Sequence, residues 1–261
     1  MIELVRQLRR HRDLLYMITW RDIRIRYKQS VMGFFWAILM PVLIVSAGVV
    51  VKVGMARVSG RPLQIADLMT VSLKSLPWAF FVGSIRFSSS SLLANSRLVA
   101  KIAFPRAVFP ISAVLSQVFD FAVASTALVA LLAAGSVGMS LQLLWVPVLL
   151  GLLFLLVTGL ALLLSAANLF FRDVKYIVDV ILTFAIFFTP VFFDVALFGP
   201  RGWILMLNPI APILEGLKAA VIEHRPPDPF WTLYSAGVSV ALAWVAPVVF
   251  RRLEPRFAEC I

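Results

Sequence analysis

The sequence predicts an all-α polytopic membrane protein with six transmembrane helices, an amphipathic N-terminal interfacial helix and short re-entrant helices before the last span. The chain is 61% hydrophobic and 14% charged, with a mean hydropathy of +0.96, so a water-soluble core would lack polar cover. A basic amphipathic segment, residues 3–28, runs directly into 23 uncharged residues, Gln29 to Val51. Further charge-poor stretches follow, long enough to cross a hydrocarbon core about 30 Å thick.

These stretches predict where the chain crosses the membrane. The 51 uncharged residues from Phe121 to Phe171 are enough for two crossings, and the glycine-containing segment 135–142 favours a turn between them. Arg86 interrupts the second stretch. The expected spans are 32–53, 76–94, 108–134, 143–169, 175–193 and 229–250.

The apolar segment 199–222 is unlike the spans, because Pro209 and Pro212 disfavour one continuous helix. Each half is too short to cross a bilayer, so we interpret it as two short re-entrant helices that dip in from the outer face. The whole chain, 1–261, then forms a single transmembrane domain. Its expected parts are an amphipathic helix (1–28), a six-span bundle (29–253) and a cytoplasmic tail (254–261).

The basic residues predict the orientation. Six spans place both termini on one side, and sixteen of the 24 basic residues then lie on the side of the termini, which the positive-inside rule makes cytoplasmic. The net charge of +11 could indicate nucleic acid, but the basic residues flank apolar runs, so attraction to lipid headgroups explains them better. A cleaved signal peptide within residues 1–50 is an alternative, although the apolar run is longer than a usual signal sequence.

The N-terminal segment has an aromatic face and a basic stripe at helical spacing. The aromatic face holds Tyr16, Trp20, Ile23 and Tyr27. The basic stripe, about 100° away, holds Arg21, Arg24 and Lys28. This pattern is typical of a helix at the membrane surface. It serves either as a topology signal and anchor or as the border of a cytoplasmic opening where a phosphate-bearing substrate meets the arginines.

Two loops are candidates for docking a cytoplasmic partner. In 92–110, Asn95 or Ser96 can cap a short helix that Pro105 stops, with Arg97 and Lys101 one turn apart. The connection 168–180 places Arg172 and Asp173 at the same boundary as a second, smaller surface. The alternative for the first is a solvated positive-inside loop, and the alternative for the second is a charge pair at a helix end.

Five segments in order resemble the transmembrane permease subunit of type-2 ABC exporters for lipid-linked polysaccharides such as O-antigen, capsule or teichoic acid. They are RDIRIRYKQSVMGFFWAILMP (21–41), LPWAFF (76–81), NSRLVAKIAFPRAVFP (95–110), ANLFFRDVKYIVDVILTFAIFFTPVFFD (167–194) and LNPIAPILEGLKAAV (207–221). The resemblance implies a homodimer in the bacterial inner membrane that binds two ABC ATPase subunits and exports an undecaprenyl-pyrophosphate-linked polysaccharide. Arg86 and Ala107 depart from the family pattern.

The resemblance also implies roles for individual residues. The segment near 95–106 would be the coupling helix. Its docking residues, with the second loop, would be Asn95, Arg97, Lys101, Phe104, Pro105, Arg106, Arg172 and Asp173. Residues 1–28 would be the gate helix, with Tyr16, Trp20, Arg21, Arg24, Tyr27 and Lys28 at the substrate gate.

The path for a polysaccharide is expected among clustered aromatic residues, since aromatic faces pack against the C–H faces of sugars. The candidates for the channel lining are Phe34, Trp36, Trp78, Phe80, Phe81 and Arg86. Ordinary helix packing is the alternative for each aromatic residue. Arg86 and Asp120 are charges inside spans, which are costly unless paired or wet, and they could pair with each other. Asp179 and Glu215 are weaker candidates of the same kind.

The sequence contains no GxxxxGK[ST] motif, so it lacks the phosphate-binding loop of an ATPase. We therefore expect ATP and Mg²⁺ to bind the partner ATPase. The sequence also has no HExxH motif, one cysteine and only two histidines, so we expect no catalytic residue, metal ligand or cofactor in this chain. An exporter of drugs or lipids with the same topology is the first rival hypothesis. An ion-coupled secondary transporter or an intramembrane enzyme is the second, and it would rely on Arg86 and Asp120.

Overall fold

The computed structural model describes residues 2–28, 35–60, 64–101, 104–135 and 137–259, and every regular element among them is helical. The α-helices are α1 (Ile2–Arg10), α2 (Arg12–Lys28), α3 (Phe35–Ser59), α4 (Ile65–Ala94), α5 (Ser96–Lys101), α6 (Val108–Ala134), α7 (Trp145–Phe170), α8 (Val174–Ala185), α9 (Trp203–Met206), α10 (Ile210–Val221) and α11 (Pro229–Leu253). Short 3₁₀ helices are η1 (Leu141–Leu144), η2 (Ile186–Phe188), η3 (Val195–Arg201) and η4 (Glu254–Glu259).

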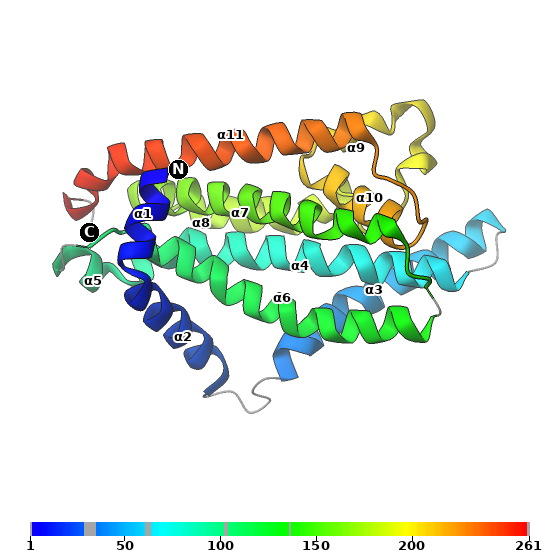
Figure 1. Cartoon of the computed structure of the whole chain (residues 1–261), viewed down its shortest axis with the longest axis horizontal. Coiled ribbons are helices and arrows are strands. Elements are labelled where there is room, and N and C mark those ends of the chain that lie inside the picture. The colour runs from blue at the N-terminus through cyan, green and yellow to red at the C-terminus, as the bar shows by residue number, and fades with distance from the viewer. Residues whose placement is uncertain (1, 29–34, 61–63, 102–103, 136, 260–261) are drawn as a thin grey trace.

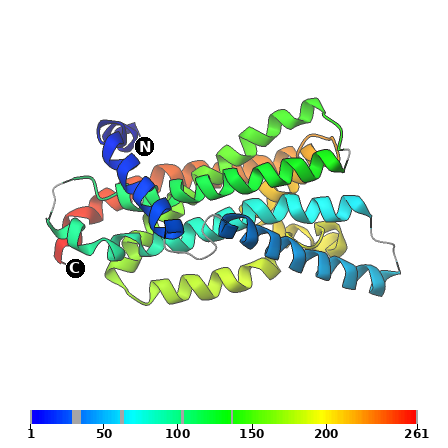
Figure 2. The same ribbon diagram turned by 90° about the horizontal axis from the view of Figure 1, so that it is seen from below.

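The long helices form an elongated bundle with two distinct ends (Figure 1). One end, here called the inner end, carries α1, α2, α5 and both termini of the chain. The other, the outer end, carries the α3–α4 and α6–α7 connections together with α9 and α10. Helices α1 and α2 run obliquely to the bundle axis, as Figure 2 shows from below.

Four helical stretches are long and apolar enough to cross a membrane, among the residues described: Ile65–Ala94, Val108–Ala134, Leu141–Phe170 and Pro229–Phe257. The third, fourth and sixth expected spans coincide with three of them within a few residues. The turn expected at 135–142 is also present, since α6 ends at Ala134 and α7 begins at Trp145. These helices make the chain a multi-pass membrane protein.

Two expected spans differ from the structure. Helix α4 begins at Ile65 rather than near residue 76, and Pro77 lies within it. The fifth span, expected at 175–193, is not one continuous helix. Helix α8 has 12 residues, about 18 Å at 1.5 Å per residue, and is too short to cross the hydrocarbon core. Thr189 precedes Pro190 and is extended (φ −119°, ψ 131°), because a residue before proline disfavours the helical conformation.

The segment 199–222 contains two short helices, α9 and α10, on either side of Asn208. The two prolines do not break α10. Pro209 is its N-cap and Pro212 lies in its first turn, where a backbone N–H has no helical acceptor and its loss is harmless. Helix α10 is almost entirely buried against α7 and α4, so the protein itself covers this short apolar element.

The apolar core has two main clusters. The larger lies between α4, α7 and α10 and includes Trp78, Leu153 and Ile213. The other lies at the inner end, where Phe250 and Phe257 pack on residues from α6 and α7. Helices α7 and α11 make the most extensive helix contact, and Gly159 lets them approach closely.

We expect Gly159→Ala to lower the melting temperature of the purified protein in detergent. A Cβ at Gly159 would lie 2.9 Å from Cβ of Leu242 and 3.0 Å from its carbonyl carbon, so α11 must shift, at a typical overpacking cost of about 1–3 kcal/mol. The matched control is Gly151→Ala on the same helix, where no heavy atom lies within 4 Å. Equal melting temperatures for the two variants would contradict this account of the α7–α11 contact.

Candidate functional site

A cavity of about 420 Å³ lies between the N-terminal helix α2 and the helices α3, α4 and α6. Its wall is mostly apolar and aromatic, with residues such as Trp78, Phe80 and Phe121. The charged residues in the wall are Arg26, Arg86 and Asp120. Two of the three were singled out from the sequence, while Arg26 was not.

The polar group in this cavity is built on Asp120 of α6. Its carboxylate forms an ion pair with Arg26 and accepts a hydrogen bond from the hydroxyl of Tyr27, both from α2. Arg26 also donates to Oγ of Ser116 at 3.2 Å, and its guanidinium lies 4.5 Å from the ring centre of Phe87. Burial, followed by the neighbouring Asp120 carboxylate, raises the pKa of the Tyr27 hydroxyl, so Tyr27 stays protonated as a donor.

The hypothesis that Arg86 pairs with Asp120 is wrong. Nε of Arg86 donates to Oδ1 of Asp179 on α8 at 2.9 Å, while α2 supplies the partner of Asp120. The Arg86 side chain is 48% exposed and that of Asp179 is 37% exposed. The reason is the position of α2, which packs on α6 and brings Arg26 to Asp120 from a part of the chain more than ninety residues away.

The expected channel-lining aromatics are partly brought together. Trp78 and Phe80 both line the cavity. Phe81 stacks on Trp78, with ring centres 5.5 Å apart, and Phe80 lies 5.4 Å from Phe121. Phe34 lies outside the described residues, and Trp36 belongs to α3 but its side chain is not among those described.

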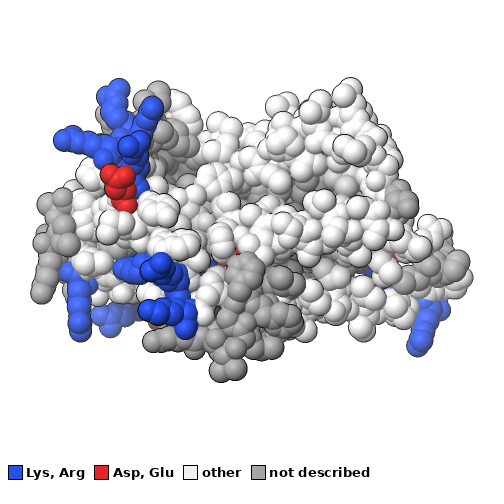
Figure 3. Space-filling view, turned by 60° about the horizontal axis from the view of Figure 1, so that its bottom comes forward, with Lys and Arg blue, Asp and Glu red and all other residues white. Residues whose placement is uncertain are grey.

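Five of the six expected gate residues share the outward face of α2. They line a shallow open depression of about 440 Å³ with Met17 and Ile25, and they are Tyr16, Trp20, Arg21, Arg24 and Lys28. Tyr16 stacks on Trp20, and the guanidinium of Arg24 lies 5.2 Å from the Trp20 ring. Tyr27 hydrogen-bonds instead to Asp120 on α6. Figure 3 shows basic side chains gathered toward one end of the molecule, with a largely uncharged middle.

The expected docking residues divide into exposed and internally bonded ones. Arg97, Arg172 and Asp173 are exposed at the inner end. Asn95 does not cap α5 with its side chain: its amide donates to the carbonyl of Ser91 and accepts from Arg21. The side chain of Lys101 is not among those described.

The end of the expected coupling segment is bonded to the C-terminal part of the chain. The backbone N–H of Arg106 donates to Glu254 at 2.9 Å, and its guanidinium donates to the Glu254 carbonyl. Phe104 packs on Phe109, and Pro105 precedes this corner between α5 and α6. Arg106 and Phe104 therefore hold the loop in place, which the spacing of the sequence did not indicate.

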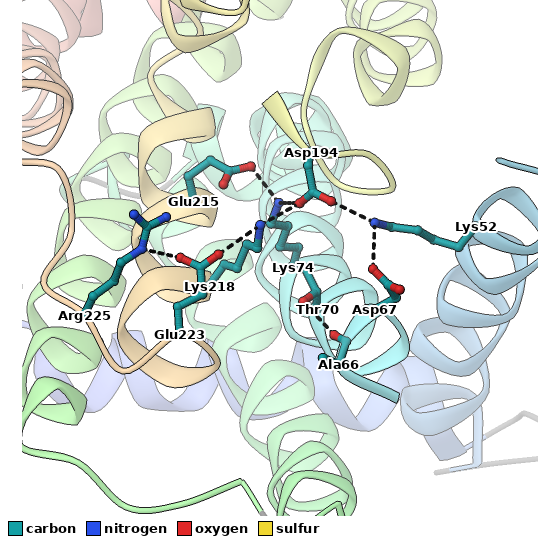
Figure 4. A network of polar contacts seen from close by, with 10 residues as sticks. All are labelled: Lys52, Ala66, Asp67, Thr70, Lys74, Asp194, Glu215, Lys218, Glu223 and Arg225. Atoms are coloured by element: carbon teal, nitrogen blue, oxygen red, sulfur yellow. Dashed lines mark hydrogen bonds and ion pairs between the residues drawn. The ribbon is translucent and has the colours of Figure 1, made fainter. Parts of the chain in front are cut away.

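A second charged group, which the sequence pattern did not predict, lies at the outer end (Figure 4). Asp194 accepts from Lys218 at 2.7 Å and from Lys52 at 2.9 Å, and lies 3.8 Å from the fully buried Lys74. Lys74 also donates to Glu215 at 2.6 Å. The group links α3, α4 and α10, and we call it the outer network. It comprises Lys52, Asp67, Lys74, Asp194, Glu215, Lys218, Glu223 and Arg225.

The charges of the outer network balance, since four cations face four carboxylates. Burial alone would raise the pKa of the Asp194 carboxyl, but hydrogen bonds from Lys218 and Lys52 and the charge of Lys74 hold it well below its usual range. Asp194 therefore stays ionised, and the network acts as a structural tie. Among the described side chains, no group of three or more His, Cys, Asp or Glu could hold a metal ion.

Comparison with known proteins identifies the family. A model of the ABC-2 type transporter family matches residues 13–222, most of the chain, and the protein belongs to this family. It is similar over its full length to the O-antigen export system permease protein RfbA of Myxococcus xanthus, with 31% identity and 100% of each chain covered. Two O-antigen export system permease proteins RfbA of Klebsiella pneumoniae are 28% and 26% identical over 95% of each chain.

We expect Asp194→Asn to destabilise the protein by about 2 kcal/mol, because three lysines lose a charged acceptor in a largely buried site. The measurement is thermal unfolding in detergent. Asp13→Asn is the control, since the Asp13 side chain is 93% exposed and its exposed ion pair with Arg12 contributes little. A melting temperature for Asp194→Asn equal to that of the control would show that the outer network is not a tie.

Proposed function

We propose that the protein is the membrane-spanning subunit of an ATP-driven ABC exporter that carries lipid-linked polysaccharide, such as O-antigen, across the bacterial inner membrane. The observation that carries the proposal is its full-length similarity to three O-antigen export permeases, within a family matched over residues 13–222. The chain would not hydrolyse ATP, since its sequence has no phosphate-binding loop.

The proposed topology keeps six crossings with both termini in the cytoplasm. Helix α7 ends at the inner end and α11 begins at the outer end, so the chain between them must traverse the bundle once. The fifth crossing would consist of α8, η2 and the irregular segment up to Asp194, which is tolerated where protein or water covers the backbone. Helices α9 and α10 would then be the re-entrant pair on the outer side.

The proposed path begins at the outward face of α2, where Arg21, Arg24 and Lys28 would attract the pyrophosphate of the lipid carrier and Trp20 would lie at headgroup depth. Two copies of the chain would enclose the channel for the sugar polymer. The half-exposed Arg86–Asp179 pair supports this, because charges in a membrane segment need water or a partner surface.

The energy would come from two ABC ATPase subunits docked at the inner end. Helix α5 with the exposed Arg97, and the α7–α8 connection with Arg172 and Asp173, form the proposed docking surface. ATP and Mg²⁺ would bind the ATPase subunits. ATP-driven closure of those subunits would push these two elements, and the spans would tilt to open the path.

We expect the double variant Trp20→Ala, Arg24→Ala to reduce surface O-antigen several-fold in cells that depend on this permease, because it removes the Arg24–Trp20 contact and one phosphate-binding cation. The measurement is the ratio of exported to cytoplasmic polysaccharide at equal permease levels. The control is Leu233→Ala, an exposed apolar residue on α11. Wild-type export by the double variant would remove α2 from the proposed path.

We expect Arg97→Glu to reduce copurification of the ATPase several-fold while membrane insertion is unchanged, because it reverses an exposed charge on the proposed docking helix. The control is Arg57→Glu, which reverses an exposed charge near the outer end of α3. Equal ATPase recovery with the two variants would refute the docking role of α5.

A further inference from the structure

The contact between the gate helix and α6 depends on a charge pair that lies in the proposed substrate path. Asp120 binds two consecutive residues of α2, Arg26 through an ion pair and Tyr27 through a hydrogen bond. The side chains of Arg26 and Asp120 are 23% and 19% exposed, beside a cavity with aromatic walls. Separating them would leave a poorly solvated charge on each side, so α2 stays closed on α6 unless another ion replaces one partner.

The cavity favours an anion as the replacement. Its wall carries the guanidinium groups of Arg26 and Arg86 and the carboxylate of Asp120, and Asp179, the partner of Arg86, lies outside the wall. Arg26 is also held in place by neutral acceptors. Ser116 accepts from it at 3.2 Å, and Gln117, with its amide oxygen turned toward α2, accepts from both terminal nitrogens at 2.7 and 2.8 Å. An anion that displaced Asp120 would therefore meet a positioned guanidinium.

The chemistry of the replacement follows from the guanidinium. Arginine binds phosphate oxygens in the same forked geometry as carboxylate oxygens, and a diphosphate carries more charge than one carboxylate. Arg24 and Lys28, on the outward face of α2, lie two residues to either side of Arg26 in the sequence. Because residues two apart point to opposite sides of a helix, a diphosphate group gathered by that face would have to pass around α2 to reach Arg26 at the cavity.

We propose that Asp120 is an internal counter-ion that holds the gate helix closed until the diphosphate of a polyprenyl lipid replaces it at Arg26. This inference rests on the proposed function. In the resting state Asp120 occupies the position that a substrate phosphate later takes. Displacement would free α2 from α6 and open the aromatic cavity to the first sugars of the polymer. Trp78 and Phe80 in the cavity wall offer the faces on which sugar rings pack.

The experiment measures how fast a cysteine placed in the cavity wall reacts with a water-soluble thiol reagent. The protein, assembled with its ATPase in nanodiscs, carries Ala79→Cys in the cavity wall and Cys260→Ser to remove its one native cysteine. We expect slow labelling in this background. Undecaprenyl diphosphate in the disc should accelerate labelling at least several-fold. Equal concentrations of inorganic pyrophosphate in solution, or phosphatidylglycerol in the disc, separate a free phosphate or an ordinary anionic lipid from the proposed ligand.

Two further variants distinguish the proposed counter-ion role of Asp120 from a purely structural role. Asp120→Asn should label fast without any ligand and gain little from undecaprenyl diphosphate. The exchange Arg26→Asp with Asp120→Arg restores an ion pair between α2 and α6, so it should label slowly again in the absence of ligand. If Asp120→Asn, shown to be folded by its elution as an intact complex, labels as slowly as the background, or if the exchanged pair labels as fast as Asp120→Asn, the proposal is overturned.

A parallel assay of polysaccharide export by the unmodified complex distinguishes a failure of the Asp120 proposal from a failure of the proposed function. Export by the unmodified complex, together with labelling of Asp120→Asn as slow as the background, would overturn the proposed role of Asp120 and leave the proposed function standing. Fast labelling in Asp120→Asn, with no export of any lipid-linked polysaccharide by the unmodified complex, would overturn the proposed function and retain Asp120 as the closing contact. If pyrophosphate in solution alone opens the cavity, the lipid part of the ligand is wrong.

Discussion

A charge inside the hydrocarbon layer must have a partner or water, and this constraint decides how the polar side chains of this protein are arranged. Asp120 meets this requirement through Arg26 of α2, and Arg86 meets it through Asp179. At the outer end, the fully buried Lys74 meets it through Glu215 and Asp194. Each of these pairs joins elements that are far apart in the sequence, so pairing the charges also sets which helices pack together.

The two polar groups have different consequences because their surroundings differ. The outer network has balanced charges and joins Glu215 and Lys218 of the buried helix α10 to α3 and α4, so it holds the outer end together. The Asp120 group lies beside an open volume of about 420 Å³ and joins one interfacial helix to the bundle. A buried network such as the outer one suits a fixed element. In an ion pair next to a cavity, by contrast, an incoming ion can replace one partner. For this reason α2 is the element that we propose to move during transport.

Much of the fold could be predicted from the sequence because membrane spans depend on the length of apolar runs. The spans near 108–134, 143–169 and 229–250 coincide with helices found in the structure. The fifth span is not the continuous helix that was expected, because apolar composition does not report the backbone conformation that Pro190 imposes on Thr189. Helical spacing predicted an aromatic face and a separate basic stripe on α2. In the structure Tyr16 and Trp20 line one depression together with the stripe, whereas Ile23 is buried and Tyr27 is drawn inward by a hydrogen bond to α6.

The contacts between distant residues could not be predicted from one sequence. Arg26 reads as one basic residue among several in an interfacial helix, and only the packing of α2 on α6 shows that it faces Asp120. Lys52 and Lys218 read as outer-loop charges for the same reason. The spacing around 95–106 indicated a docking loop, but not that Arg106 is bonded to Glu254 and therefore holds the loop in place.

The central claim is that this chain forms a transport path and takes its energy from a separate ATPase. The most direct measurement is the transfer of lipid-linked O-antigen across proteoliposomes that contain the chain alone or together with its ATPase. The account predicts ATP-dependent transfer only when both proteins are present. Transfer against a gradient by this chain alone, driven by protons or sodium ions, would contradict it.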